Sequence, residues 1–202
     1  MMRVLFEPGR GHIAAPAIFL DRDGVINRRR PNDYVLEWSQ FTFIPGIREA
    51  LKKLSSLLRM PMVVISNQAA VGKGLLKPSD LETITRRMHQ VLSADGTAIA
   101  AYYYCIHKSD DHCHCRKPRP GLLFESASDL NIDLTRSVFI GDSESDVRAA
   151  RSAGCEPIFF GGPNVAQLPD LTGGTLEEVA VVSGAEELFP VVFNCLAALR
   201  EK

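Results

Sequence analysis

Phe19-Leu20-Asp21-Arg22-Asp23-Gly24-Val25-Ile26-Asn27 is the stretch of sequence that decides the fold. The apolar residues 17–20 are typical of a strand buried on both faces, and Gly24 ends that pattern. Asp21 and Asp23 are therefore expected where the strand becomes a loop, at the edge where open α/β sheets bind ligands. Two carboxylates this close repel each other unless a cation lies between them or one is protonated. Such a pair can supply a nucleophile and a proton carrier beside a divalent metal.

Further polar groups follow apolar runs or lie in loops along the chain. They are Ser66-Asn67 after the run 62–65, Arg116-Lys117-Pro118 in a loop, and Gly141-Asp142 after the run 138–140, with Asp146 four residues later. The carboxyl ends of parallel strands meet at one edge of a sheet, so these groups are expected to gather beside Asp21 and Asp23.

Taken in order, these motifs resemble the haloacid dehalogenase (HAD) superfamily of aspartate-nucleophile phosphohydrolases. The matching residues are Asp21-x-Asp23, Ser66, Lys117 and Gly141-Asp142-x-x-x-Asp146. Within the superfamily the chain looks most like the heptose-bisphosphate and histidinol phosphatases. That narrower resemblance rests on Asp21 to Asn27, Ser66-Asn67-Gln68, Cys105-x-His107 and Cys113-x-Cys115-Arg116-Lys117-Pro118-x-Pro120-Gly121.

The resemblance implies a role for each of these side chains. Asp21 is expected to attack phosphorus, and Asp23 to protonate the leaving alcohol and then activate water. Ser66 and Lys117 would stabilise the phosphoryl oxygens. Asp21, the backbone carbonyl of Asp23 and Asp142 would hold Mg²⁺, with Asp146 either supporting that metal or capping the next helix. The residues expected to contact substrate are Arg22, Asn67 and Arg116.

A second group of residues has the chemistry of a metal site. Cys105-x-His107-x₅-Cys113-x-Cys115 places four soft or borderline ligands within eleven positions, which suits tetrahedral, structural zinc. Paired cysteines one residue apart are not the spacing of ordinary zinc fingers, and a reactive cysteine cluster is the alternative. The resemblance favours zinc, and His112 and His114 are not expected to be ligands. Zinc would fix the loop 105–119, which leads directly into Arg116 and Lys117.

Composition limits the class of protein. The 202 residues are enough for one well-buried domain, with residues 1–16 as an N-terminal extension of unknown purpose. The net charge of −1 gives no general attraction to nucleic acid or membranes. There is no long apolar segment, and the five cysteines are odd in number and mostly clustered, so a cytoplasmic location is expected. The protein is also expected to be a monomer. Arg28-Arg29-Arg30 either forms a solvated loop or binds an anionic substrate.

Alternating strand and helix signals predict an α/β fold with a doubly wound, mostly parallel sheet. The intervals between the motifs are too short for a large cap domain, so an open site with flaps at 28–43 and 105–119 is expected. Pro45 is expected to begin one helix, and a Ser79/Glu82 capping box another. The remaining expectations are strands at 101–105, 156–160 and 179–182, helices from 120 to 130, from Asp142 to Gly154 and at 190–200, and a loop at 161–177.

The expected activity, by resemblance, is Mg²⁺-dependent removal of the 7-phosphate from a heptose 1,7-bisphosphate. Histidinol phosphatase is the alternative in the same branch, and the flap residues from Asn32 to Val35 favour the heptose side. Ile106, Ser143 and Ala69-Ala70 depart from the usual heptose pattern without touching the nucleophile or the expected metal ligands. A polynucleotide 3′-phosphatase and a non-enzymatic zinc-binding module are further alternatives.

Overall fold

The computed structural model describes residues 1–5, 14–30, 33–161 and 179–201. Seven strands form one sheet in the order β1-β4-β3-β2-β5-β6-β7. The strands are β1 (Met2–Leu5), β2 (Ile18–Leu20), β3 (Met62–Asn67), β4 (Ile99–Cys105), β5 (Val138–Gly141), β6 (Glu156–Phe160) and β7 (Ala180–Val182). All neighbours pair in parallel except β1, which runs antiparallel to β4. The predicted doubly wound, mostly parallel sheet without a large cap is confirmed.

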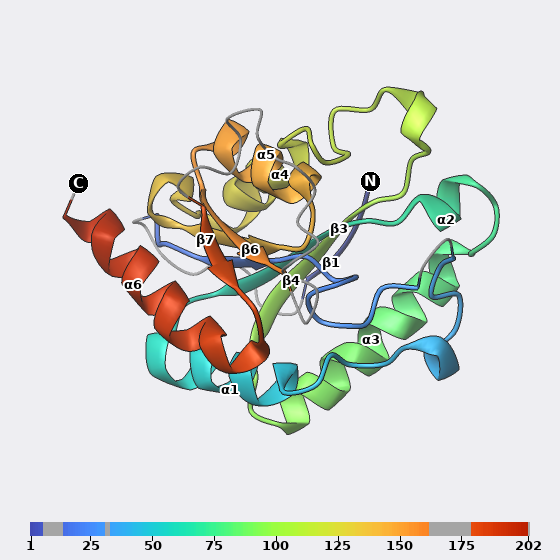
Figure 1. Ribbon diagram of the computed structural model, residues 1–202. Coiled ribbons are helices and arrows are strands. Elements are labelled where there is room, and N and C mark those ends of the chain that lie inside the picture. The colour runs from blue at the N-terminus through green and yellow to red at the C-terminus, as the bar shows by residue number, and fades with distance from the viewer. Residues whose placement is uncertain (6–13, 31–32, 162–178, 202) are drawn as a thin grey trace.

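Helices cover both faces of this sheet (Figure 1), with α4 and α5 on one side and α1, α3 and α6 on the other. The helices are α1 (Ile47–Leu58), α2 (Ala69–Gly72), α3 (Pro78–Ala94), α4 (Gly121–Leu130), α5 (Glu144–Ala153) and α6 (Leu188–Arg200). Successive strand residues point to opposite faces: Ile18 and Leu20 pack on the α1/α3 side, and Phe19 packs on the α4/α5 side. A strand buried on both faces therefore reads as a continuous apolar run.

The chain order of the strands explains where the site lies. From β2 the chain builds the sheet in one direction through β3 and β4, and it then returns to pair β5 on the other side of β2. The carboxyl ends of β2 and β5 thus flank the point where the winding reverses, which is where open α/β sheets have a crevice. Asp21 and Asp142 follow these two strands directly.

Two expected helix starts differ from the structure. Helix α1 begins at Ile47, because Gly46 adopts φ +75°, outside the helical range, and Pro45 therefore lies before the helix. Helix α3 begins at Pro78, which needs no backbone N–H partner at the first turn. Ser79 then lies inside the helix, and no side chain caps it, so the Ser79/Glu82 capping box was wrong.

The N-terminal residues were read only as an extension, but Met2–Leu5 form the edge strand β1. The C-terminal ends of α4 and α5 agree with expectation, and Gly154 caps α5 with φ +76°. The loop expected at 161–177 lies outside the described residues from 162 onward, as does Asn32. No helix in the described part of the chain is both long and apolar enough to span a membrane.

Candidate active site

Asp21 lies in the crevice at the end of β2. Its backbone N–H donates to the carbonyl of Ile140 on β5 (2.9 Å), which continues the sheet by one residue and fixes the carboxylate at the edge. Gly24 closes the following turn with φ +98°. A β-carbon at Gly24 would overlap the carboxylate of Asp142, so glycine allows the loop after β2 and the loop after β5 to approach this closely.

Lys117 is the cation at the centre of the site. Its ammonium lies 2.9 Å from Asp21 Oδ1 and 2.6 Å from Asp146 Oδ1, and it donates to the carbonyl of Ile65 at 3.0 Å. The side chain is buried, so burial alone would lower the pKa of Lys117. The attraction of Asp146 and Asp21 outweighs burial and raises that pKa. Lys117 therefore carries its charge beside the Asp21 carboxylate.

Residues at the end of β3 hold Lys117 and Asp23 in place. The Asn67 amide donates to the backbone carbonyl of Lys117 and accepts from its N–H, both at 3.1 Å. The Gln68 amide donates to Asp23 Oδ2 (2.7 Å) and to Ser66 Oγ (3.1 Å). Both ends of the Asn67 amide are thus engaged, and its expected contact with substrate stays a prediction. Gln68 belongs to the Ser66-Asn67-Gln68 motif, but the sequence alone does not indicate that Gln68 binds Asp23.

Asp142 and Asp146 complete a cluster of carboxylates with Asp21. One oxygen of each lies within 4.8 Å of the others, so these residues could hold a metal ion with oxygen ligands, as Mg²⁺ prefers. Asp146 also accepts from the N–H (3.0 Å) and hydroxyl (2.6 Å) of Ser143 and so caps α5. Asp142 is bound by Arg29 Nη2 at 2.6 Å.

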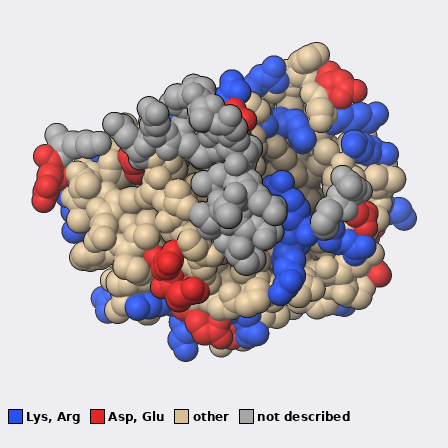
Figure 2. All heavy atoms as spheres, in the orientation of Figure 1, with Lys and Arg blue, Asp and Glu red and all other residues tan. Residues whose placement is uncertain are grey.

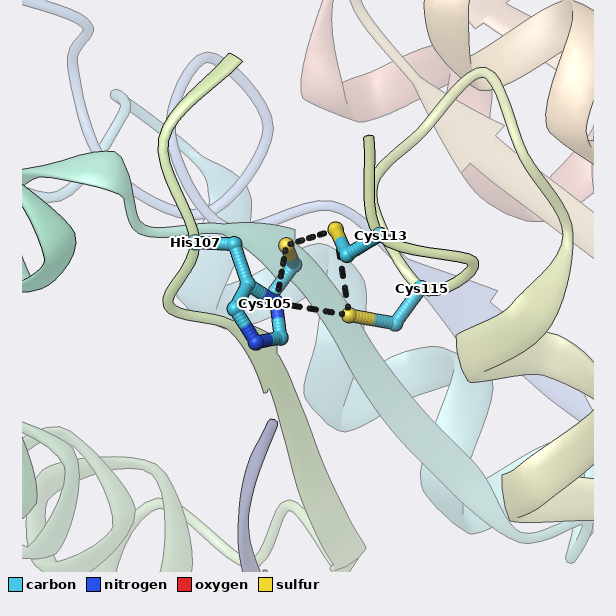
Figure 3. A group of neighbouring side chains, drawn as sticks. All are labelled: Cys105, His107, Cys113 and Cys115. Carbon is cyan, nitrogen blue, oxygen red and sulfur yellow. Dashed lines mark hydrogen bonds between the residues drawn. The ribbon is translucent and has the colours of Figure 1, made fainter. Parts of the chain in front are cut away.

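The cysteine and histidine residues of the 105–115 segment converge, as Figure 3 shows. Cys105 Sγ lies 3.6 Å from Cys113 Sγ and 3.6 Å from His107 Nδ1. Cys115 Sγ lies 3.2 Å from His107 Nδ1 and 3.6 Å from Cys113 Sγ. Cys105 ends β4, whereas Cys115 precedes Arg116 and Lys117. The four donor atoms could hold a metal ion that would tie the sheet to the loop of Lys117.

A cavity of about 560 Å³ opens over Asp21, Asp23 and Ser66. Its outer lining is rich in cations, namely Arg29, Arg30, Lys73 and Arg116. Lys73 donates to the hydroxyl of Tyr34, another lining residue, at 2.9 Å. Figure 2 shows Lys and Arg side chains gathered in a band near the middle of one face of the molecule and toward its upper right. A cavity whose opening is lined by cations attracts anionic ligands.

Comparisons with known proteins place this site in a family. The family model described as "HAD-hyrolase-like" matches residues 114–162. A D-glycero-alpha-D-manno-heptose-1,7-bisphosphate 7-phosphatase of Mycobacterium tuberculosis is 38% identical over 173 residues, which cover 83% of this chain and 90% of the relative. The chain belongs to the phosphatases of the haloacid dehalogenase superfamily.

Other relatives of this HAD phosphatase agree. A D-glycero-beta-D-manno-heptose-1,7-bisphosphate 7-phosphatase of Pseudomonas aeruginosa is 34% identical over 172 residues, covering 83% of this chain and 96% of the relative. The solved D,D-heptose 1,7-bisphosphate phosphatase of B. bronchiseptica, complexed with magnesium and phosphate, superposes with a TM-score of 0.77 at 30% identity, covering 93% and 99% of the two chains. The resemblance inferred from the motifs is thereby confirmed, and a non-enzymatic binding module is excluded.

Without a divalent ion, the carboxylates of this HAD phosphatase make its stability depend on pH. Burial raises the pKa of Asp142 from its ordinary 3.8 to about 7, helped by the charge of Asp21. Burial likewise raises the pKa of Asp21 to about 6. The folded state thus binds these protons more tightly than the unfolded state, so their contribution to stability is full below pH 3.8 and is lost as pH rises toward 7.

We expect the melting temperature of metal-free protein to be higher at pH 5 than at pH 7.5. Adding Mg²⁺ should raise the melting temperature at pH 7.5 more than at pH 5, because the cation favours the ionised carboxylates. Differential scanning fluorimetry after chelation checks this. A melting temperature that rises steadily from pH 5 to 7.5 without metal would contradict the raised pKa values of Asp21 and Asp142.

Proposed function

We propose that this HAD phosphatase removes the 7-phosphate from a D-glycero-D-manno-heptose 1,7-bisphosphate in the cytoplasm. The observation that carries the proposal is the arrangement of the cavity, with the Asp21 carboxylate at its base and four cations around its opening. This layout suits a ligand with two phosphates. The relatives named above act on such a sugar bisphosphate.

Arg116 supports a site for the second phosphate. Its Nη1 is buried and has no hydrogen-bond partner among the described residues, although the side chain lines the cavity. A buried donor without a partner costs about 1–3 kcal/mol, and a bound phosphate would remove that cost. Arg116 follows Cys115 directly, so the cysteine cluster would hold it in position.

The proposed chemistry proceeds in two transfers. Asp21 attacks phosphorus as the bond to the sugar oxygen breaks, and Asp23, once protonated, gives its proton to that oxygen. Burial favours this proton, but the donors Arg22, Asn27 and Gln68 outweigh burial and lower the pKa of Asp23. Asp23 then takes a proton from water, whose oxygen bonds to phosphorus as the bond to Asp21 breaks. Lys117 and Ser66 stabilise the charge on the phosphoryl oxygens. Mg²⁺ bound by Asp21, Asp142 and the backbone carbonyl of Asp23 would supply further positive charge at these oxygens.

We also propose that Cys105, His107, Cys113 and Cys115 bind one structural zinc ion. Tetrahedral zinc with Zn–S bonds of about 2.3 Å sets its sulfur atoms about 3.8 Å apart. The 3.6 Å sulfur separations support that geometry. The proposed ligand set leaves out His112, which is not among the four clustered residues.

The test is phosphate release from both anomers of heptose 1,7-bisphosphate, from heptose 7-phosphate, from histidinol phosphate and from a 3′-phosphorylated oligonucleotide. We expect kcat/KM to be highest for a heptose 1,7-bisphosphate, by about 10²-fold over the 7-phosphate. Arg116→Ala should remove most of that preference by raising KM for the bisphosphate. Preferential turnover of histidinol phosphate or of the oligonucleotide would replace the proposed substrate and leave the phosphatase assignment intact.

Arg29 is expected to compete with Mg²⁺ for Asp142. Its guanidinium binds the carboxylate oxygen Oδ1 at 2.6 Å, so a cation can use that oxygen only by displacing Arg29. Arg29→Gln should therefore tighten Mg²⁺ binding several-fold, as measured by isothermal titration calorimetry. Arg30→Gln is the matched control, because Arg30 pairs with Asp33 instead. Equal Mg²⁺ affinity in both variants would contradict the competition.

A further inference from the structure

Arg22 is among the residues that line the cavity, but its guanidinium is turned toward Asp23. It stands between the two motif aspartates, but its side chain is only 1% exposed and is among the largest fully buried side chains in the described residues. Its Nη2 lies 2.9 Å from both carboxylate oxygens of Asp23. The guanidinium thus binds Asp23 from within the protein, while the Asp23 side chain keeps 25% of its surface exposed.

This placement is unfavourable for stability. Arg22 Nε and Nη1 are buried and have no hydrogen-bond partner within the described part of the chain, and each such donor costs about 1–3 kcal/mol. A well-packed apolar side chain often replaces a buried charge pair with little loss of stability, or with a gain. Stability alone therefore does not account for an arginine at this position, whereas its contact with both oxygens of Asp23 does.

Three donors together fix the Asp23 carboxyl group. Asn27 Nδ2 donates to Oδ1 at 2.9 Å, Gln68 Nε2 donates to Oδ2 at 2.7 Å, and Arg22 contacts both oxygens. Asn27 and Gln68 each bind one oxygen and Arg22 contacts both, so the three donors together resist rotation about the Cβ–Cγ bond. Proton transfer needs the carboxyl oxygen within hydrogen-bond reach of the reacting oxygen, so this orientation matters for rate.

We propose that Arg22 is a positioning residue that holds Asp23 for proton transfer to the leaving oxygen. The proposal rests on the role of Asp23 given under the proposed function. The expectation that Arg22 contacts substrate stays a prediction.

The test compares two leaving groups in kcat/KM, which reports the steps through cleavage of the first ester bond. The sugar alkoxide of heptose 1,7-bisphosphate needs a proton to leave, whereas p-nitrophenolate from p-nitrophenyl phosphate leaves as a stable anion. Arg22→Met should lower kcat/KM for the sugar phosphate by about 10²-fold, with less than about a fivefold loss for p-nitrophenyl phosphate. Arg22→Lys should recover part of the loss, and Asp23→Asn should show the same selectivity with a larger effect.

Each outcome separates the two proposals. Equal losses on both substrates in Arg22→Met, or a rise in KM alone, would overturn the positioning role while Asp23→Asn still shows leaving-group dependence. If Asp23→Asn shows no such dependence, the proposed role of Asp23 fails first. Melting temperatures are measured alongside. The melting temperature of Arg22→Met is expected to lie above the wild-type value or within a few degrees below it. Failure of both Arg22 variants to fold would make Arg22 structural and would overturn the proposal.

Discussion

Asp21→Asn is expected to lower phosphate release by at least about 10⁴-fold, because an amide cannot form the acyl-phosphate bond that the proposed mechanism requires. Residual turnover would come only from the remaining cations and the metal. Acid quench followed by mass spectrometry should find phosphate on the peptide that contains Asp21 in wild type, and none in the variant.

The same substitution should leave the fold intact. Asp21 repels Asp142 and Asp146, and burial disfavours its charge, so the neutral amide should raise the melting temperature of metal-free protein. Lys117 keeps its contact with Asp146. Asp80→Asn, an exposed position on α3, is the matched control and should retain full activity. An active Asp21→Asn variant would refute the nucleophile assignment.

Loss of zinc is expected to have the second large effect. Cys113→Ser should reduce bound zinc from about one per chain to near zero, measured by inductively coupled plasma mass spectrometry. Because Cys115 leads directly into Arg116 and Lys117, release of the loop should raise KM more than tenfold or abolish turnover. The chemistry at Asp21 would be untouched, so phosphorylation of that residue should still occur at saturating substrate if Lys117 remains in place.

Cys195→Ser is the control for this experiment. Cys195 lies on α6, outside the cysteine and histidine cluster, and its loss should change neither zinc content nor KM. A zinc-free Cys113→Ser protein with wild-type kinetics would refute the proposed role of the metal. Disulfide-linked protein in place of bound zinc would favour the reactive cysteine cluster instead.

The strand ends of the site could be predicted because the strands are buried on both faces. Such strands have no polar residues until they end, so Asp21, Ser66 and Asp142 stand out at the boundaries. The edge strand Met2–Leu5 could not be recognised in the same way. It has four residues, half-exposed or exposed except for Val4, and its partner β4 lies about a hundred residues later.

The partners of the polar side chains were the least predictable part of the site. Asn67 bonds to the backbone of Lys117, fifty residues away, and Arg29 bonds to Asp142, 113 residues away. Such pairs depend on how loops meet after the sheet has formed, which residue type and spacing do not specify. For Arg22, the sequence did not indicate that the buried guanidinium binds Asp23.

The close approach of Gly24 to the Asp142 carboxylate gives a criterion for judging which related genes encode active enzymes. A related gene can encode every motif residue, Asp21 through Asp146, and still carry alanine at the position of Gly24. The added methyl group would overlap the Asp142 carboxylate, and the positive φ would strain the turn. Such a gene would encode a protein with this fold and a displaced Asp142 carboxylate, the proposed Mg²⁺ ligand, so it is expected to be a pseudoenzyme that motif searches would count as active.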